Sequence, residues 1–249
     1  MNDKKRNNRK KLILPHEHGG WAMVSAPFLL GMFTGTVRWM HLLLFLAWLC
    51  FYLSSYPILQ SWKRKLERDR YIRWGIGYGM AGLFLVIIPL VDTPQLACFA
   101  APLLVLVLIN IWYAKRKSER ALLNDGCAIL VFTIGGAAAY LFGGGGWDKM
   151  MAMIVIFSFL HFMGTVFFIK TVFRERSNKR YTNYAYFYHS ILLILPSVMG
   201  FPWMTIPYVL SIIRVFVFAG KPLRPSHAGI IEIVCTLQFL FLSVFLIRL

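Results

Sequence analysis

The sequence predicts an all-α protein, a polytopic bundle of about nine transmembrane helices. Of its 249 residues, 58% are hydrophobic and only 15% are charged, and the mean hydropathy is +0.62. A soluble domain carries roughly 25% charged residues, so this chain has too few polar groups to cover a surface exposed to water. Soluble globular, disordered and collagen-like classes are therefore excluded.

Nine apolar segments qualify as spans, because a bilayer core of about 30 Å takes roughly 20 helical residues, or fewer where a helix ends in a protein-lined cavity. In chain order they cover residues 20–35, 40–60, 74–91, 96–113, 121–142, 149–170, 184–199, 204–220 and 228–247. Residues 1–18 form a basic tail before the first span, and residues 19–249 form the nine-helix membrane domain. The tail lacks a following apolar stretch with a cleavage site, so we expect it to be retained.

The lysines and arginines support this division into spans, since cytoplasmic loops are enriched in them. All but three of the 27 lie in the tail, in the second, fourth, sixth and eighth loops, or in the halves of the spans that adjoin those loops, the exceptions being Arg38, Lys149 and Arg248. The intervening loops, such as 91–95, 143–146 and 200–203, are short and rich in Gly, Pro and Trp, as tight turns at an interface are. This alternation predicts a bacterial inner-membrane protein with a cytoplasmic N-terminus and an outer C-terminus.

The formal net charge of +17 has the same explanation. In so apolar a chain it indicates membrane topology and contact with anionic lipid headgroups, so we expect the lipid bilayer, and not nucleic acid, as the partner. The four cysteines lie in apolar segments without paired spacing, namely Cys50, Cys98, Cys127 and Cys235. They are typical of buried apolar residues, and the sequence predicts neither a metal site nor a cofactor.

The first group of candidate site residues is His16, Glu17 and His18, at the mouth of the first span. Two histidines around a carboxylate suggest a metal site, but adjacent ligands rarely converge on one ion without further donors. Anchoring of the tail or contact with a bound headgroup is the favoured interpretation.

The second group follows the fourth span and contains Lys115, Arg116 and Arg120. Asn124 and Asp125 come next and are expected to cap the amides of the following helix. The group either contributes to an anion site or forms an ordinary positive loop followed by a helix cap.

The third group is Lys170, Arg174 and Arg180, after the sixth span. If the sixth helix extends past the apolar segment, Lys170 and Arg174 lie four residues apart on one face. Two cations on one face repel each other unless an anion lies between them, and arginine binds phosphate oxygens in a bidentate manner. The alternative is an exposed basic loop touching anionic lipid.

Within the spans, Arg214 and Glu232 lie at similar depths in the last two helices. Ionisable groups in a bilayer are expensive and are paired or functional as a rule. Because antiparallel neighbours would bring these two level, we expect an intramembrane ion pair. His161 and His189 are expected to be hydrogen-bonded packing residues.

Four segments resemble the YwiC-like family of bacterial multispanning membrane proteins: residues 15–22, 113–120, 174–176 and 229–232. The first of these, Pro-His-Glu-His-Gly-Gly-Trp-Ala, is the most specific. This resemblance implies a membrane location and leaves the activity open.

Residues 25–31 resemble the first helix of the UbiA-type prenyltransferases more distantly. That resemblance implies a nine-helix arrangement with a cavity on the cytoplasmic side. Those enzymes hold Mg²⁺ with two Asp-rich motifs, whereas the matching regions here, 55–64 and 170–180, are basic. Because Mg²⁺ prefers carboxylate oxygens, Mg²⁺-dependent prenyl transfer is not expected, and any enzymatic activity would be metal-independent group transfer.

Together these observations predict a basic pocket, open to the cytoplasm, that binds an anionic amphiphile of the isoprenoid, quinone or lipid phosphate type. The expected binding residues are Arg64, Lys115, Arg116, Arg120, Lys170, Arg174 and Arg180, with His16, Glu17 and His18 near the entrance. Two alternatives remain. One is a transporter, although no internal repeat is evident, and the other is an accessory protein whose basic face docks a cytoplasmic partner.

Overall fold

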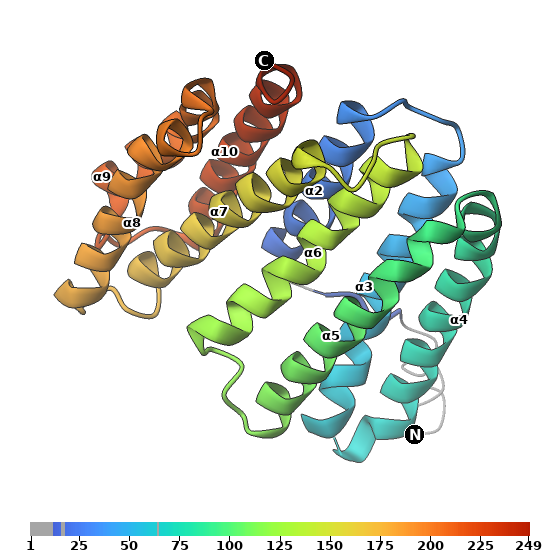
Figure 1. The fold of residues 1–249 in the computed structure, drawn as a ribbon. Coiled ribbons are helices and arrows are strands. Elements are labelled where there is room, and N and C mark those ends of the chain that lie inside the picture. The colour runs from blue at the N-terminus through green and yellow to red at the C-terminus, as the bar shows by residue number, and fades with distance from the viewer. Residues whose placement is uncertain (1–11, 16–17, 64) are drawn as a thin grey trace.

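The computed structural model describes residues 12–15, 18–63 and 65–249, and over these residues the chain forms nine α-helices and no strand (Figure 1). The α-helices are α2 (His18–Thr34), α3 (His41–Lys63), α4 (Arg68–Asp92), α5 (Ala100–Lys115), α6 (Leu122–Phe142), α7 (Lys149–Val172), α8 (Lys179–Val198), α9 (Val209–Phe218) and α10 (Pro225–Leu246). Short 3₁₀ helices precede α4, α5 and α9, namely η1 (Lys65–Glu67), η2 (Pro94–Phe99) and η3 (Pro202–Tyr208). The predicted all-α fold class is confirmed.

Each predicted segment corresponds to one helix, but several ends differ. α4 begins at Arg68 and α8 at Lys179, well before the predicted starts at residues 74 and 184. Hydropathy marks only the apolar part of a helix, whereas a helix can continue past it in basic residues, whose long side chains keep their charged ends among water and headgroups. The fourth and eighth segments start as η2 and η3, each with proline in its first turn, where proline's missing N–H is tolerated.

Six of the described helices are long and apolar enough to cross a membrane: α3, η1–α4, η2–α5, α6, α7 and α10. α2 and η3–α9 are apolar but shorter, and α8 has a polar first half. Several long apolar helices indicate a membrane protein. That all nine segments span, and which end faces the cytoplasm, remain predictions.

Charge is sorted between the two ends of the bundle. Successive helices alternate in direction (Figure 1), so segments 65–68, 115–122, 172–179 and 218–225 lie at the same end of the bundle, which we term the basic end. Among the described lysines and arginines, only Arg38, Lys149 and Arg248 lie at the opposite end. Among the described residues of the basic end, acidic side chains are far fewer than basic ones, which leaves that end strongly positive.

The centre of the bundle is the crossing of α2 and α6, with α7 packed on α6 and α10 on α2. Gly31 and Gly136 meet there, and a Cβ atom on Gly31 would overlap the carbonyl oxygen of Gly136. Small residues at a crossing let two backbones approach closely, which is how helices associate in a membrane. Phe28 and Leu30 are fully buried beside this contact.

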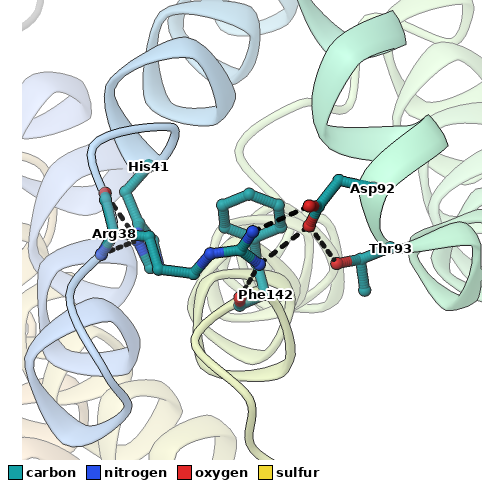
Figure 2. A network of polar contacts seen from close by, with 5 residues as sticks. All are labelled: Arg38, His41, Asp92, Thr93 and Phe142. Atoms are coloured by element: carbon teal, nitrogen blue, oxygen red, sulfur yellow. Dashed lines mark hydrogen bonds and ion pairs between the residues drawn. The ribbon is translucent and has the colours of Figure 1, made fainter.

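A polar network closes the opposite end of the bundle (Figure 2). Both Nη atoms of Arg38 donate to Asp92 at 2.7 Å, and Nη1 also lies 3.3 Å from the carbonyl oxygen of Phe142. His41 Nδ1 accepts from the Arg38 amide at 2.9 Å, and Nε2 lies 3.0 Å from the carbonyl oxygen of Ala139. Because a carbonyl oxygen can only accept, the contact of Nε2 with Ala139 is one in which Nε2 carries a proton and donates it. The network joins the ends of α3, α4 and α6.

Replacing Asp92 with asparagine should lower the melting temperature, because Arg38 then loses its bidentate carboxylate partner. The loss should shrink as NaCl is raised, since the pair is partly exposed to solvent and salt screens it. Thermal unfolding in detergent at low and high salt measures both effects. Asp69→Asn is the control, because this carboxylate makes no ion pair among the described residues. An equal loss in the control would assign the effect to general charge removal.

Candidate functional site

A pocket of about 390 Å³ lies at the basic end, where the start of α6, the end of α7 and the start of α8 meet. We term it the basic pocket. Its lining residues are Arg120, Leu122, Phe167, Lys170, Arg174, Glu175, Tyr181 and Tyr184. Three of the seven predicted binding cations, Arg120, Lys170 and Arg174, are thus brought together.

Lys170 joins two walls of the basic pocket. It lies in the last turn of α7 and is buried, with Nζ 2.6 Å from Asp125 Oδ2 on α6. The same Nζ donates to the carbonyl oxygen of Arg120 at 2.9 Å. Lys170 therefore fixes the spacing of α6 and α7, and its charge is already balanced by a carboxylate.

The condition under which Lys170 and Arg174 would share a helix face is not met, because α7 ends at Val172. A turn follows instead, in which the Glu175 amide donates to the carbonyl oxygen of Lys170 at 2.7 Å. This turn is what places Arg174 and Glu175 in the pocket wall. Within the part of the chain that the structure describes, the guanidinium groups of Arg120 and Arg174 make neither a hydrogen bond nor an ion pair, and both residues are exposed.

The other wall of the basic pocket is aromatic. The ring of Tyr181 lies 6.0 Å from that of Phe167 and 6.3 Å from that of Tyr184, measured between centroids. The Tyr181 hydroxyl is buried, and no described residue bonds to it. Burial, helped by the nearby Asp125 and Glu175 carboxylates, raises the pKa of Tyr181 to about 12. The hydroxyl therefore stays protonated at neutral pH and can donate to an anion.

Lys115 and Arg116 lie outside this pocket. Lys115 Nζ is 5.2 Å from the ring centroid of Trp62, and Arg116 Cζ is 3.9 Å from that of Trp112. Nearby, Lys63 Nζ pairs with Glu119 Oε2 at 2.5 Å, which ties the end of α3 to the loop before α6. These cations therefore sit on indole rings, at positions suited to a headgroup layer.

The remaining predicted site residues are not among those that line the basic pocket. Arg180 is exposed in the first turn of α8. His16, Glu17 and Arg64 fall outside the described residues, and so does the side chain of His18, where α2 begins.

The expected capping of α6 by Asn124 and Asp125 is wrong. The N-cap is Ala121, which offers no side-chain acceptor. Asn124 instead donates to the carbonyl oxygen of Glu119 at 2.8 Å, and Asp125 pairs with Lys170. Both side chains therefore shape the pocket and the loop before it.

Sequence reasoning missed the five pocket residues that are not basic: Leu122, Phe167, Glu175, Tyr181 and Tyr184. One signal was available, because Tyr181 and Tyr184 are three residues apart just after a basic loop and so share a helix face.

The structure brings Arg214 and Glu232 together inside the bundle. Arg214 Nη1 lies 2.5 Å from Glu232 Oε2, with both side chains almost fully buried. Nη2 donates to Thr165 Oγ1 at 3.3 Å, and the guanidinium carbon lies 4.9 Å from the centre of the Phe168 ring. Three helices, α7, α9 and α10, thus meet at this pair.

The two interior histidines pack against neighbours in the same half of the bundle. His161 stacks on Phe239 with a centroid distance of 4.2 Å, and its Nε2 lies 3.3 Å from Thr236 Oγ1. His189 Nδ1 lies 2.8 Å from the carbonyl oxygen of Ala185. Of the four cysteines, Cys98 is exposed, so its expected burial is wrong.

Long apolar helices and charge sorted to one end define a polytopic helical membrane protein. Residues 14–140 match the family described as YwiC-like protein, and the chain belongs to that family. A relative from Bacillus subtilis (strain 168), described as "Uncharacterized protein YwiC", is 37% identical over 230 residues, 92% of this chain and 96% of the relative.

A second relative, from Haemophilus influenzae and described as "Uncharacterized protein", is 30% identical over 232 residues, 93% of this chain and 97% of the relative. No solved structure matches the chain. The expected family membership is confirmed, and the UbiA-like arrangement stays a prediction.

Proposed function

We propose that the basic pocket binds the headgroup of an anionic membrane amphiphile, of the isoprenoid, quinone or lipid phosphate type. The observation that carries the proposal is the pair of guanidinium groups, Arg120 and Arg174, at one pocket without a partner among the described residues. Guanidinium groups bind phosphate oxygens through parallel N–H bonds. The buried Tyr181 hydroxyl supplies a further donor in the same wall.

The apolar lining suits the tail of such a ligand. Leu122 and Phe167 line the pocket beside the cations, and Tyr184 is 59% exposed at the start of α8. A hydrocarbon tail along these side chains would remove apolar surface from water, which stabilises the complex by about 25 cal/mol per Å² of apolar surface buried. The proposed ligand therefore has both a charged and an apolar part.

The basic end belongs on the cytoplasmic side of a bacterial inner membrane in this proposal, by the positive-inside rule. Its ligand is then a lipid of the inner leaflet. Mg²⁺-dependent prenyl transfer is no part of the proposal, because Glu175 is the single acid among the eight lining residues and Mg²⁺ requires carboxylate ligands.

The test is native mass spectrometry of the gently solubilised protein. The wild-type chain should retain a phosphorylated or otherwise anionic amphiphile, and the Arg120→Gln/Arg174→Gln variant should lose at least ~90% of it, since each charge-assisted contact is worth about 1.5–3 kcal/mol. Lys115→Gln/Arg116→Gln is the matched control, because it removes two cations of the same end outside the pocket. Equal retention in both double variants would refute the proposal.

A further inference from the structure

The charges around the basic pocket nearly cancel. Three cationic side chains face two carboxylates there, Glu175 in the lining and Asp125 on Lys170, so the formal net charge is +1. Because Lys170 is already paired with Asp125, the two arginines are the charges left for a ligand, and Glu175 opposes one of them.

Glu175 is held in the pocket wall. Its amide bonds to the carbonyl oxygen of Lys170 at 2.7 Å, and its Oε2 accepts from Asn178 Nδ2 at 2.9 Å. The backbone turn thus holds Glu175 in the lining next to Arg174, and the hydrogen bond from Asn178 orients its carboxylate. A ligand with excess negative charge would be repelled by it.

We propose that the ligand of the basic pocket carries a single negative charge, as the phosphodiester of a glycerophospholipid does, and that Glu175 selects against more highly charged phosphates. The inference rests on the proposed function and narrows its ligand class. One phosphodiester charge neutralises the pocket. A phosphomonoester, at about −1.5 to −2, and an isoprenyl diphosphate, with more, would leave uncompensated negative charge beside Glu175 and Asp125.

Tyr181 fits the same ligand. Its buried hydroxyl is a neutral donor, so it adds a hydrogen bond to a phosphoryl oxygen without adding positive charge. The other basic residues of the loop, Arg176, Lys179 and Arg180, do not line the basic pocket. Salt screens charges at a greater distance from the ligand more strongly, so these residues attract all anions and discriminate little among them.

The experiment compares two lipids with identical tails, dioleoyl phosphatidylglycerol and dioleoyl phosphatidic acid, titrated against the purified full chain in detergent. The wild-type chain should bind phosphatidylglycerol at least threefold more tightly. Glu175→Gln raises the pocket charge by one and should abolish or reverse that preference. Glu67→Gln is the control, because Glu67 is an acid of the same end whose ion pair is with Arg70, outside the pocket.

The outcomes separate the inference from the proposed function. Two results would overturn the charge selection while leaving the pocket as a binding site. One is tighter binding of phosphatidic acid by the wild type, and the other is an equal change of lipid preference in Glu175→Gln and Glu67→Gln. Unchanged binding of both lipids by Arg120→Gln/Arg174→Gln would overturn the proposed function itself. Tail-free glycerophosphoglycerol should bind at least tenfold more weakly, and equally tight binding would make the ligand a soluble phosphodiester.

Discussion

Glutamine in place of Glu232 should lower the free energy of unfolding by about 3–5 kcal/mol, among the largest losses of any single polar substitution in the chain. The side chains of Arg214 and Glu232 are 2% and 10% exposed, and they pair at 2.5 Å. Without the carboxylate, the guanidinium group would remain buried with neutral neighbours such as Thr165 Oγ1 and the Phe168 ring. Unfolding by heat or by a graded series of sodium dodecyl sulfate measures the loss.

A double-mutant cycle shows whether this loss belongs to the pair. Arg214→Gln should also be strongly destabilising, but the Arg214→Gln/Glu232→Gln variant should lose less than the sum of the two, by about 1–3 kcal/mol, because no unpaired charge remains. His227→Ala, a truncation of an exposed polar side chain in the first turn of α10, should have little effect. Strictly additive losses would show that the two residues do not interact.

The helices could be predicted from the sequence because span length and apolar composition are local properties. The residues at which the helices begin and end on the basic side of the bundle could not be predicted, as α8 shows. Lys179 and Arg180 are helical, yet a hydropathy argument places them in a loop because they are charged. What extends the helix is the Asn178 side chain, which accepts from the Tyr181 amide at 3.4 Å as the N-cap.

The basic residues of the site could be identified from sequence, but their grouping could not. Arg116 and Arg120 are four residues apart, yet one lies over Trp112 and the other lines the basic pocket. The chain reverses between them at Lys117, whose φ of 56° is in the left-handed region. Such a turn has no strong signal when the residue is not glycine.

The two ion pairs of the interior show the same limit. The pairing of Arg214 with Glu232 follows from depth alone, because α9 and α10 are successive and antiparallel. The helices α6 and α7 are also successive and antiparallel, so depth alone allows Lys170 to meet Asp125, but a helix cap was an equally good local use of Asp125. Where a side chain has two possible local uses, the packing of the bundle decides between them.

The α2–α6 crossing should not tolerate alanine in place of either Gly31 or Gly136. A Cβ atom on Gly136 would lie 2.5 Å from the carbonyl oxygen of Pro27, and one on Gly31 would overlap Gly136 itself. Both obstacles are backbone atoms within helices, so they cannot move aside as the tip of a side chain can. Gly136→Ala should therefore force the helices apart and lower the free energy of unfolding by about 3 kcal/mol, the upper part of the range for overpacked cores.

Two alanine substitutions elsewhere in the bundle separate this steric effect from helix propensity. A Cβ atom on Gly77 in α4 or on Gly229 in α10 would meet nothing within 4 Å, so alanine there should be neutral or should stabilise by about 0.5–1 kcal/mol. Thermal unfolding of the four variants then tests the crossing directly. Phe28 and Leu30 are buried next to the α2–α6 crossing, so separation of the two helices would expose core surface. Gly31→Ala should therefore lower the free energy of unfolding as Gly136→Ala does. If all four variants matched the wild type, α2 and α6 would not be in backbone contact, and the central packing of the bundle would have to differ.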